Sequence, residues 1–179
     1  MKGENASGRP HFHSPQRLRL HAGAYFLTLC THAHLCLFGP IERGRLRPSA
    51  AGGIVAGEWR RTRHVRPSVS LDAWVVMPNH FHAIVFLRGE EPVETGAGTG
   101  GAHLNRRPRS LGSLVSGFKA TSTARITRAL GTPGRRIWQR GYFDRVIRSE
   151  EHLERVRQYI LENPLRWSED RYFRDREIG

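Results

Sequence analysis

The chain has 179 residues, of which 38% are hydrophobic and 25% are charged, and this is the composition of a globular protein the size of one domain. Its apolar runs are far shorter than the roughly 20 residues that span a bilayer, and its polar first ten residues do not resemble a signal peptide. We therefore expect a cytoplasmic protein with no membrane partner. The net charge is +13, and all but two of the 29 basic residues are arginine. Because guanidinium groups contact phosphate in a bidentate manner, this charge favours a nucleic-acid partner, although a GC-rich genome also enriches arginine.

The first half of the chain predicts a basic N-terminal arm over residues 1–22, a strand at 25–31, and a helix capped by Ser49 that runs to Val65. Two further strands follow at 71–77 and 80–87. Pro78 and Asn79 alone separate them, and these residues suit the central positions of a turn, so we expect an antiparallel hairpin.

Residues 88–108 are rich in glycine, threonine and arginine, and they predict a flexible loop. The second half then predicts a helix from Ser110 to about Leu130, short strands at 137–139 and 143–147, and a helix over 150–162 capped by Ser149. Pro164 ends this last helix, and residues 168–179 form a short polar tail.

The order of elements is strand, helix, strand, strand, helix, strand, helix. Two βαβ halves around a central hairpin predict an α+β, ferredoxin-like fold (βαββαβ), with an antiparallel sheet and helices on one face. The uncovered face of the sheet is then left for a ligand or for the last helix. We expect one domain over residues 23–167.

Two histidines begin the returning strand of the hairpin. Side chains alternate along a strand, so His80 and His82 point to the same face, about 7 Å apart along the strand. Two imidazoles at this spacing can hold one metal ion, whereas a turn histidine and a packing histidine would give the same pattern. The apolar strands on both sides favour the metal site. The residues after His82 lack the further ligands of a binuclear zinc hydrolase.

The last helix carries a second pair of polar residues. Leu153, Val156 and Ile160 form its apolar stripe, and Tyr159 and Asn163 lie four residues apart at the border of that stripe. Such residues are common at the edge of an amphipathic helix. As a pair, they could place an amide oxygen at a histidine metal site and a phenol beside a bound phosphate.

Four segments together resemble one known family. They are Val76-Met-Pro-Asn-His-Phe-His-Ala-Ile84, Trp138-Gln-Arg-Gly-Tyr142, Val146-Ile-Arg-Ser-Glu-Glu151 and Tyr159-Ile-Leu-Glu-Asn-Pro164. In this order they resemble the REP-associated tyrosine transposases, which are single-tyrosine members of the HUH (histidine–hydrophobic–histidine) transposases. The resemblance extends from about Arg17 to Trp167.

The resemblance implies a catalytic C-terminal helix. His80, His82 and Asn163 would bind a divalent metal, Mn²⁺ or Mg²⁺, and Tyr159 would attack a phosphate of single-stranded or hairpin DNA, such as a repeat (REP) element. The products would be a 5′-phosphotyrosine and a free 3′-hydroxyl. All four residues belong to one chain, so we expect an active site that a monomer can form, whether the protein is a monomer or a homodimer. No small-molecule cofactor is expected.

Basic residues outside this site are candidates for DNA contact. They are Arg60, Arg61, Arg63, Arg106, Arg107, Lys119, Arg135 and Arg136. Trp138 and Phe143 could stack on a base, but core packing is the expected role of both. Two other functions stay open at this point: a basic module that binds hairpin or single-stranded DNA without cutting it, and an unrelated metal hydrolase that uses the histidine pair.

Overall fold

A computed structural model describes residues 22–88 and 110–173. Almost all of the predicted arm, nearly all of the predicted loop, and the candidate DNA-contacting residues Arg106 and Arg107 lie outside these ranges, so those predictions stay untested.

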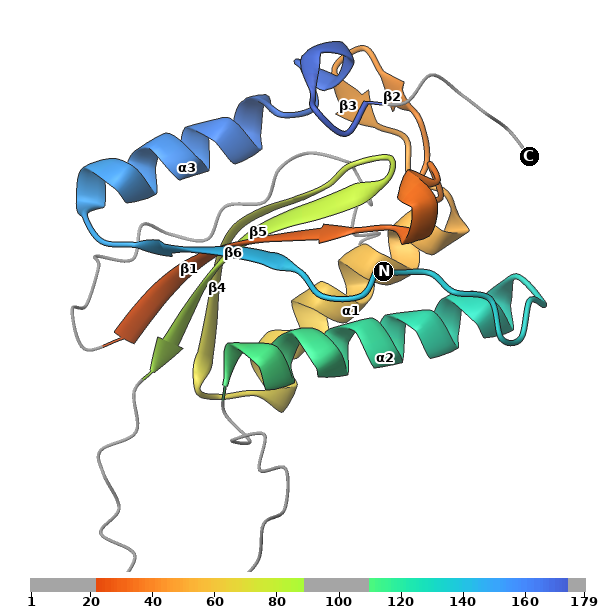
Figure 1. The fold of residues 1–179 in the computed structure, drawn as a ribbon, viewed down its shortest axis with the longest axis horizontal. Coiled ribbons are helices and arrows are strands. Elements are labelled where there is room, and N and C mark those ends of the chain that lie inside the picture. The colour runs from red at the N-terminus through yellow and green to blue at the C-terminus, as the bar shows by residue number, and fades with distance from the viewer. Residues whose placement is uncertain (1–21, 89–109, 174–179) are drawn as a thin grey trace, which may run out of the picture.

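The strands and helices follow the predicted order (Figure 1), except that residues 137–139, predicted as a short strand, form only a single bridge between Trp138 and Thr31. They are β1 (Ala22–Cys30), β2 (Ile41–Glu42), β3 (Arg45–Leu46), α1 (Ala50–Val65), β4 (Val69–Val76), β5 (His80–Arg88), α2 (Leu111–Ala129), β6 (Phe143–Ile147) and α3 (Glu150–Glu162), with short 3-10 turns at His32–His34 and Trp167–Glu169. Four strands form an antiparallel sheet in the order β4-β5-β1-β6, and β2 pairs with β3 in a separate small hairpin. The predicted α+β fold is confirmed. No helix of the described ranges is both long enough and apolar enough to cross a membrane.

Each of the three helices begins at a serine whose hydroxyl accepts a hydrogen bond from a backbone N–H in the first turn. Ser49 Oγ accepts from Gly52 N at 3.1 Å, Ser110 Oγ from Ser113 N at 3.2 Å, and Ser149 Oγ from His152 N at 3.1 Å. These bonds satisfy backbone donors that the helix itself leaves without partners. They explain why the helix starts were readable from the sequence.

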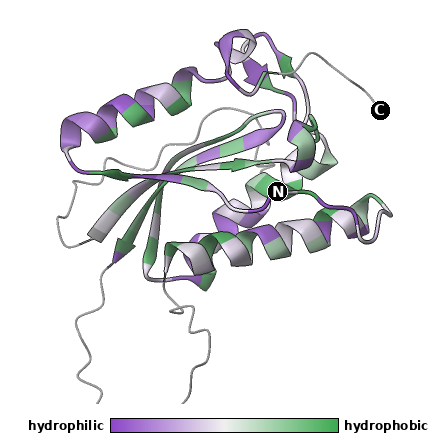
Figure 2. Ribbon diagram, viewed as in Figure 1, coloured by the Kyte–Doolittle hydropathy of each residue, from purple (hydrophilic) through white to green (hydrophobic). Residues whose placement is uncertain are grey.

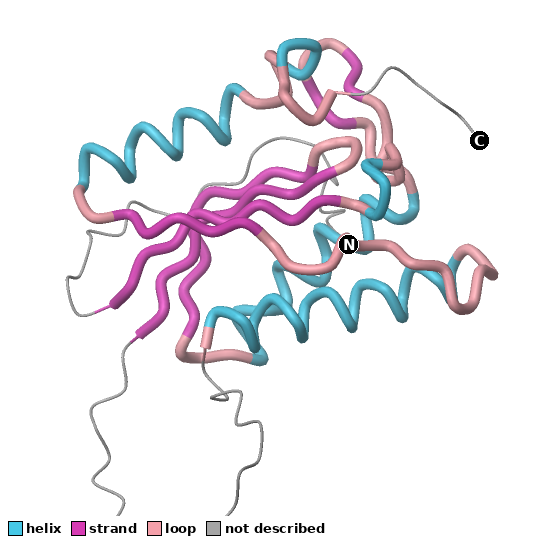
Figure 3. Tube along the Cα trace, viewed as in Figure 1, coloured by secondary structure: helices cyan, strands magenta, loops and turns pink. Residues whose placement is uncertain are grey.

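The sheet separates two layers of helix. Helices α1 and α2 lie on one face and α3 lies on the other (Figures 1 and 3). Along β5, Phe81 and Val85 belong to the core under α1 and α2, whereas Ile84 belongs to the core under α3. The histidines share the parity of Ile84 and therefore face α3. The last helix thus occupies the face that the first two leave open.

Helix α3 is mainly hydrophilic, interrupted by hydrophobic residues, as expected for a helix with one buried side (Figure 2). Its predicted stripe of Leu153, Val156 and Ile160 is buried against the sheet, as expected. This narrow apolar contact fixes which side of α3 faces β4 and β5, the strands on which it packs.

A buried ion pair joins α3 to the sheet. The register of β4 against β5 shifts between Leu71 and Trp74, and Asp72 lies in this bulge with 1% of its side chain exposed. Arg157 donates from Nε to Asp72 Oδ1 at 3.0 Å and from Nη2 to Oδ2 at 2.6 Å. Hydrogen bonding to Asp72 is the main cause that raises the pKa of Arg157. This bidentate contact fixes both the position and the rotation of α3.

We expect Arg157→Ala to destabilise the protein by about 3–5 kcal/mol, because it leaves the Asp72 carboxylate buried without its partner. Chemical denaturation followed by circular dichroism measures this loss. Arg155→Ala is the matched control: Arg155 lies on the same helix in an exposed ion pair with Glu151, and its loss should cost less than about 1 kcal/mol. Equal losses in the two variants would contradict a docking role for the buried pair.

Candidate active site

The two histidines lie in the interior of the sheet, on the face that α3 covers. His80 is 0% exposed and His82 is 1% exposed. Their ring centroids are 4.6 Å apart. His82 pairs with Thr28 on β1 and with Val75 on β4, so strands flank it on both sides. The position of both imidazoles is therefore fixed by a rigid element and not by a loop.

Hydrogen bonds orient each ring. Asn79, in the hairpin turn, donates from Nδ2 to the backbone carbonyls of His34 and Tyr172, at 3.1 and 2.7 Å. These bonds identify the other amide atom as oxygen, and it lies 2.9 Å from His80 Nδ1. An amide oxygen only accepts, so His80 Nδ1 carries the proton and Nε2 keeps its lone pair. Thr28 Oγ1 lies 2.9 Å from His82 Nδ1, so Thr28 contacts this nitrogen and not Nε2.

Both imidazoles are neutral near pH 7. Burial lowers the pKa of His80 well below its ordinary value, with further lowering from His82 and an opposing effect of the Asn163 amide. Burial also lowers the pKa of His82, to about 3. A histidine binds metal through a neutral nitrogen, so this environment keeps both side chains in the form that a metal ligand requires.

Helix α3 brings the predicted tyrosine to the histidines. Tyr159 Oη lies 3.3 Å from His82 Nε2, and Phe26 contacts both rings. The tyrosine is 43% exposed, so its phenol adjoins a buried site while part of the ring faces solvent. Burial raises the pKa of Tyr159, and the nearby Asp170 raises it further, which favours the protonated phenol.

Asn163 ends the helix beside the same group. It is 4% exposed, and its amide influences the pKa of both His80 and Tyr159. The four residues singled out from the sequence therefore lie together in space.

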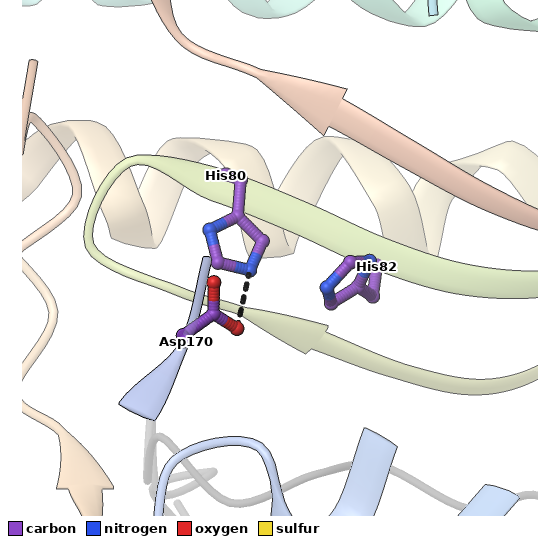
Figure 4. Close-up of side chains that lie close together, drawn as sticks. All are labelled: His80, His82 and Asp170. Atoms are coloured by element: carbon purple, nitrogen blue, oxygen red, sulfur yellow. Dashed lines mark ion pairs between the residues drawn. The ribbon is translucent and has the colours of Figure 1, made fainter. Parts of the chain in front are cut away.

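Asp170 joins this group from beyond α3, and no pattern in the sequence indicated its role. Its Oδ2 lies 3.9 Å from His80 Nε2 (Figure 4). One possible ligand atom from each of His80, His82 and Asp170 falls within 4.8 Å of the others. The segment that was predicted to be a polar tail thus packs on the site. Tyr172 in this segment is buried, and Asn79 donates a hydrogen bond to its backbone carbonyl.

The donor atoms present fit a divalent metal ion. Within the described ranges, His80 Nε2 and Asn163 Oδ1 are both buried and have no partner of hydrogen-bonding geometry. Buried polar atoms are normally satisfied, so two such atoms in one cluster are suited to a shared ligand. Imidazole, amide and carboxylate donors suit manganese, with magnesium as an alternative.

The predicted DNA-contacting residues lie elsewhere. Arg60, Arg61 and Arg63 belong to α1, on the opposite face of the sheet, and Arg60 lies over the Trp74 ring. Lys119 donates to the backbone carbonyls of Gln139 and Gly141, so its ammonium supports that loop. Arg135 and Arg136 are exposed after α2. A role in DNA binding stays a prediction for each of these residues.

The two aromatic residues expected in the core differ in outcome. Trp138 is 5% exposed and donates from Nε1 to Ser122 Oγ, as a core residue does. Phe143 is 60% exposed, so its expected core packing is wrong. It lies on the edge strand β6, away from β4 and β5, on which α3 packs.

The chain resembles both a solved structure and a sequence relative. No protein-family profile matches the sequence. The solved structure of a REP-associated tyrosine transposase bound to a REP hairpin superposes with a TM-score of 0.55 at 20% identity, over 86% of this chain and 73% of that chain. The chain thus has the fold of the REP-associated tyrosine transposases, and the resemblance found in the sequence is confirmed at the level of the fold.

A sequence relative matches the chain at higher identity. The chain is 32% identical over 164 residues to an uncharacterized protein of Haemophilus influenzae, covering 86% of each protein. The chain belongs to the same family as that protein.

Titration of the metal-free protein with Mn²⁺ tests the donor group by calorimetry. We expect His80→Ala to abolish binding. Thr28→Val removes only the hydroxyl that orients His82, and it should weaken binding about 10- to 100-fold. Val75→Ala, on the other strand beside His82, is the control and should bind Mn²⁺ like the wild type. Unchanged affinity in both Thr28→Val and His80→Ala would place any metal site elsewhere.

Proposed function

We propose that the protein is a metal-dependent nuclease and strand transferase that acts on single-stranded DNA next to a hairpin. Tyr159 is the nucleophile, and His80, His82 and Asn163 hold the metal ion. The observation that carries this proposal is the 3.3 Å approach of the Tyr159 phenol to His82, one of two buried, neutral histidines.

The reaction needs a phenol that can reach a backbone phosphate. The exposed part of Tyr159 meets this condition. Tyr159 Oη attacks phosphorus, and the bond from phosphorus to the 3′ oxygen breaks. The phenol loses its proton and the departing 3′ oxygen gains one, which leaves a 5′-phosphotyrosine and a 3′-hydroxyl. The phosphodiester energy is kept in the protein–DNA bond, so the strand can be rejoined to another 3′ end.

Phenol is a weak nucleophile near pH 7, and burial and Asp170 make Tyr159 weaker still in the absence of metal. A bound divalent ion would supply positive charge that neutralises the phosphate oxygens and orients the phosphorus. His82 Nε2 would be the ligand atom of this ring, because Thr28 Oγ1 contacts Nδ1.

Asp170 is a further donor that we add to the sequence-based set. Its carboxylate contributes negative charge to a group otherwise made of neutral ligands, which favours a divalent cation. All of these donors come from one chain, which supports a site that a monomer can form.

A hairpin-forming repeat is the proposed substrate. The superposable transposase was solved with a REP hairpin, and this chain carries the large positive charge that a DNA partner requires. A module that binds such DNA without cutting it is the alternative, and the experiment below separates the two.

We expect the protein with Mn²⁺ to form a covalent adduct with hairpin DNA whose single-stranded flanks are randomised, so that no recognition sequence is assumed. The adduct should resist denaturing electrophoresis and be absent in Tyr159→Phe. Tyr142→Phe removes a phenol on the other side of β1 and should leave the adduct unchanged. Binding without an adduct would favour the non-catalytic module, and cleavage that survives Tyr159→Phe would favour an unrelated hydrolase.

Asn163 and Asp170, the two proposed oxygen donors, can each be tested by substitution. We expect Asn163→Ala and Asp170→Ala each to weaken Mn²⁺ binding at least about tenfold, since each removes an oxygen from the group. Glu169→Ala removes the exposed carboxylate next to Asp170 and should leave the affinity unchanged. A variant at Asn163 or Asp170 that binds Mn²⁺ like the wild type would remove that residue from the ligand set.

A further inference from the structure

The edge strand β6 presents part of its side chains to the face that α3 covers. Phe143 pairs with Thr28, Arg145 with Phe26, and Ile147 with Ala24. Paired residues of neighbouring strands point to the same side of a sheet. Ile147 is covered by the core under α3, whereas Phe143 is 60% exposed and Arg145 is also exposed. Helix α3 packs on β4 and β5, so this end of the face stays open.

This open surface is continuous with the candidate active site. Phe143, Thr28 and His82 form one row across three adjacent strands. Neighbouring strands are about 4.8 Å apart, which places Phe143 on the order of 10 Å from the histidine pair. Phe26 fills the space beside this row: its ring stacks on His82 at 5.1 Å and meets the edge of Tyr159 at 5.9 Å. Aromatic rings therefore lie both at the nucleophile and at the sheet edge.

Positive charge accompanies these rings. The guanidinium carbon of Arg171 lies 6.0 Å from the centre of the Phe143 ring and 4.5 Å from that of Tyr172. Its charge acts on Tyr159, because it lowers the pKa of that phenol against the effect of burial. Arg145 adds a second exposed guanidinium on β6. We call Phe26, Phe143, Arg145 and Arg171 the β1–β6 shelf.

We infer that the β1–β6 shelf binds the single-stranded DNA segment that adjoins the phosphate attacked by Tyr159. A base stacks on the exposed ring of Phe143, and Arg145 and Arg171 contact backbone phosphates on either side. This inference rests on the proposed function, since it supplies the path by which a strand enters that site.

The chemistry of the shelf selects a single strand over a duplex. Exposed aromatic rings interleaved with arginine are typical of single-strand binding, because unpaired bases offer their faces for stacking. The bases of a duplex are already stacked and hide those faces. The basic residues of α1 lack such a ring at the surface, since Trp74 and Trp59 near them are buried.

Fluorescence anisotropy with labelled, hairpin-free single-stranded DNA tests the shelf. All proteins carry Tyr159→Phe and the buffer contains EDTA, so binding is measured without chemistry. We expect Phe143→Ala to weaken binding about 5- to 150-fold, the range for loss of one stacked base, and Phe143→Trp to retain it. Val146→Ala is the matched control: it is exposed on the same strand but faces the other side of the sheet.

The salt dependence of the affinity identifies the phosphate contacts. Each contact with a single strand adds about 0.7 to the slope of log affinity against log salt concentration. Arg145→Ala and Arg171→Ala should each lower the slope by about this amount, whereas Arg128→Ala, which removes an exposed arginine of α2 on the other face of the sheet, should not change it. The inference would be overturned if Phe143→Ala and Val146→Ala bound DNA with equal affinity. It would also be overturned if Phe143→Ala changed the oligomeric state of the protein but not its affinity for DNA.

The two proposals can fail independently. If the wild type forms no tyrosine adduct but Phe143→Ala loses affinity, the nuclease assignment fails and the shelf stands. If the adduct forms and Phe143→Ala binds like the control, the shelf fails and the nuclease assignment stands.

Discussion

The contact between Arg157 and Asp72 is the interaction on which the site depends. It is a bidentate, buried ion pair, and it sets the rotation of α3 on the sheet. Tyr159 is two residues further along the helix, so its direction follows from the docking of Arg157. Hydrophobic contacts alone allow a helix to slide or rotate by small amounts, whereas a forked guanidinium against one carboxylate does not. The β-bulge that carries Asp72 thus controls the position of the Tyr159 phenol from a distance, through Arg157.

The two faces of the sheet differ in their side chains. Large aromatic residues such as Trp59, Phe81 and Phe118 pack together under α1 and α2, and this side supplies most of the core. The face under α3 has a smaller core and includes the buried polar residues of the site. The polar groups there are held by one another, through Asn79 and Thr28, in a surrounding that excludes water and keeps the imidazoles neutral.

The position of α3 also explains why one end of the sheet is open. A helix that covered all four strands would bury the phenol and close the approach of a DNA strand. Because α3 packs on β4 and β5, the shelf on β1 and β6 is left beside Tyr159. The same ion pair that positions the Tyr159 phenol therefore leaves this end of the face uncovered.

The sequence by itself determined the order of elements, the serine caps and the side of β5 on which both histidines lie, because caps, turns and strand alternation are local properties of the chain. It also pointed to Tyr159 and Asn163 through their helical spacing and through the family resemblance. Only the tertiary structure decided that Asp170 and Asn79 join the histidines and that Phe143 is exposed. These outcomes depend on contacts between residues far apart in the chain, such as Asn79 with the carbonyl of Tyr172, and on which strand forms the edge of the sheet. No local pattern encodes such contacts, since they are set by how complete elements pack.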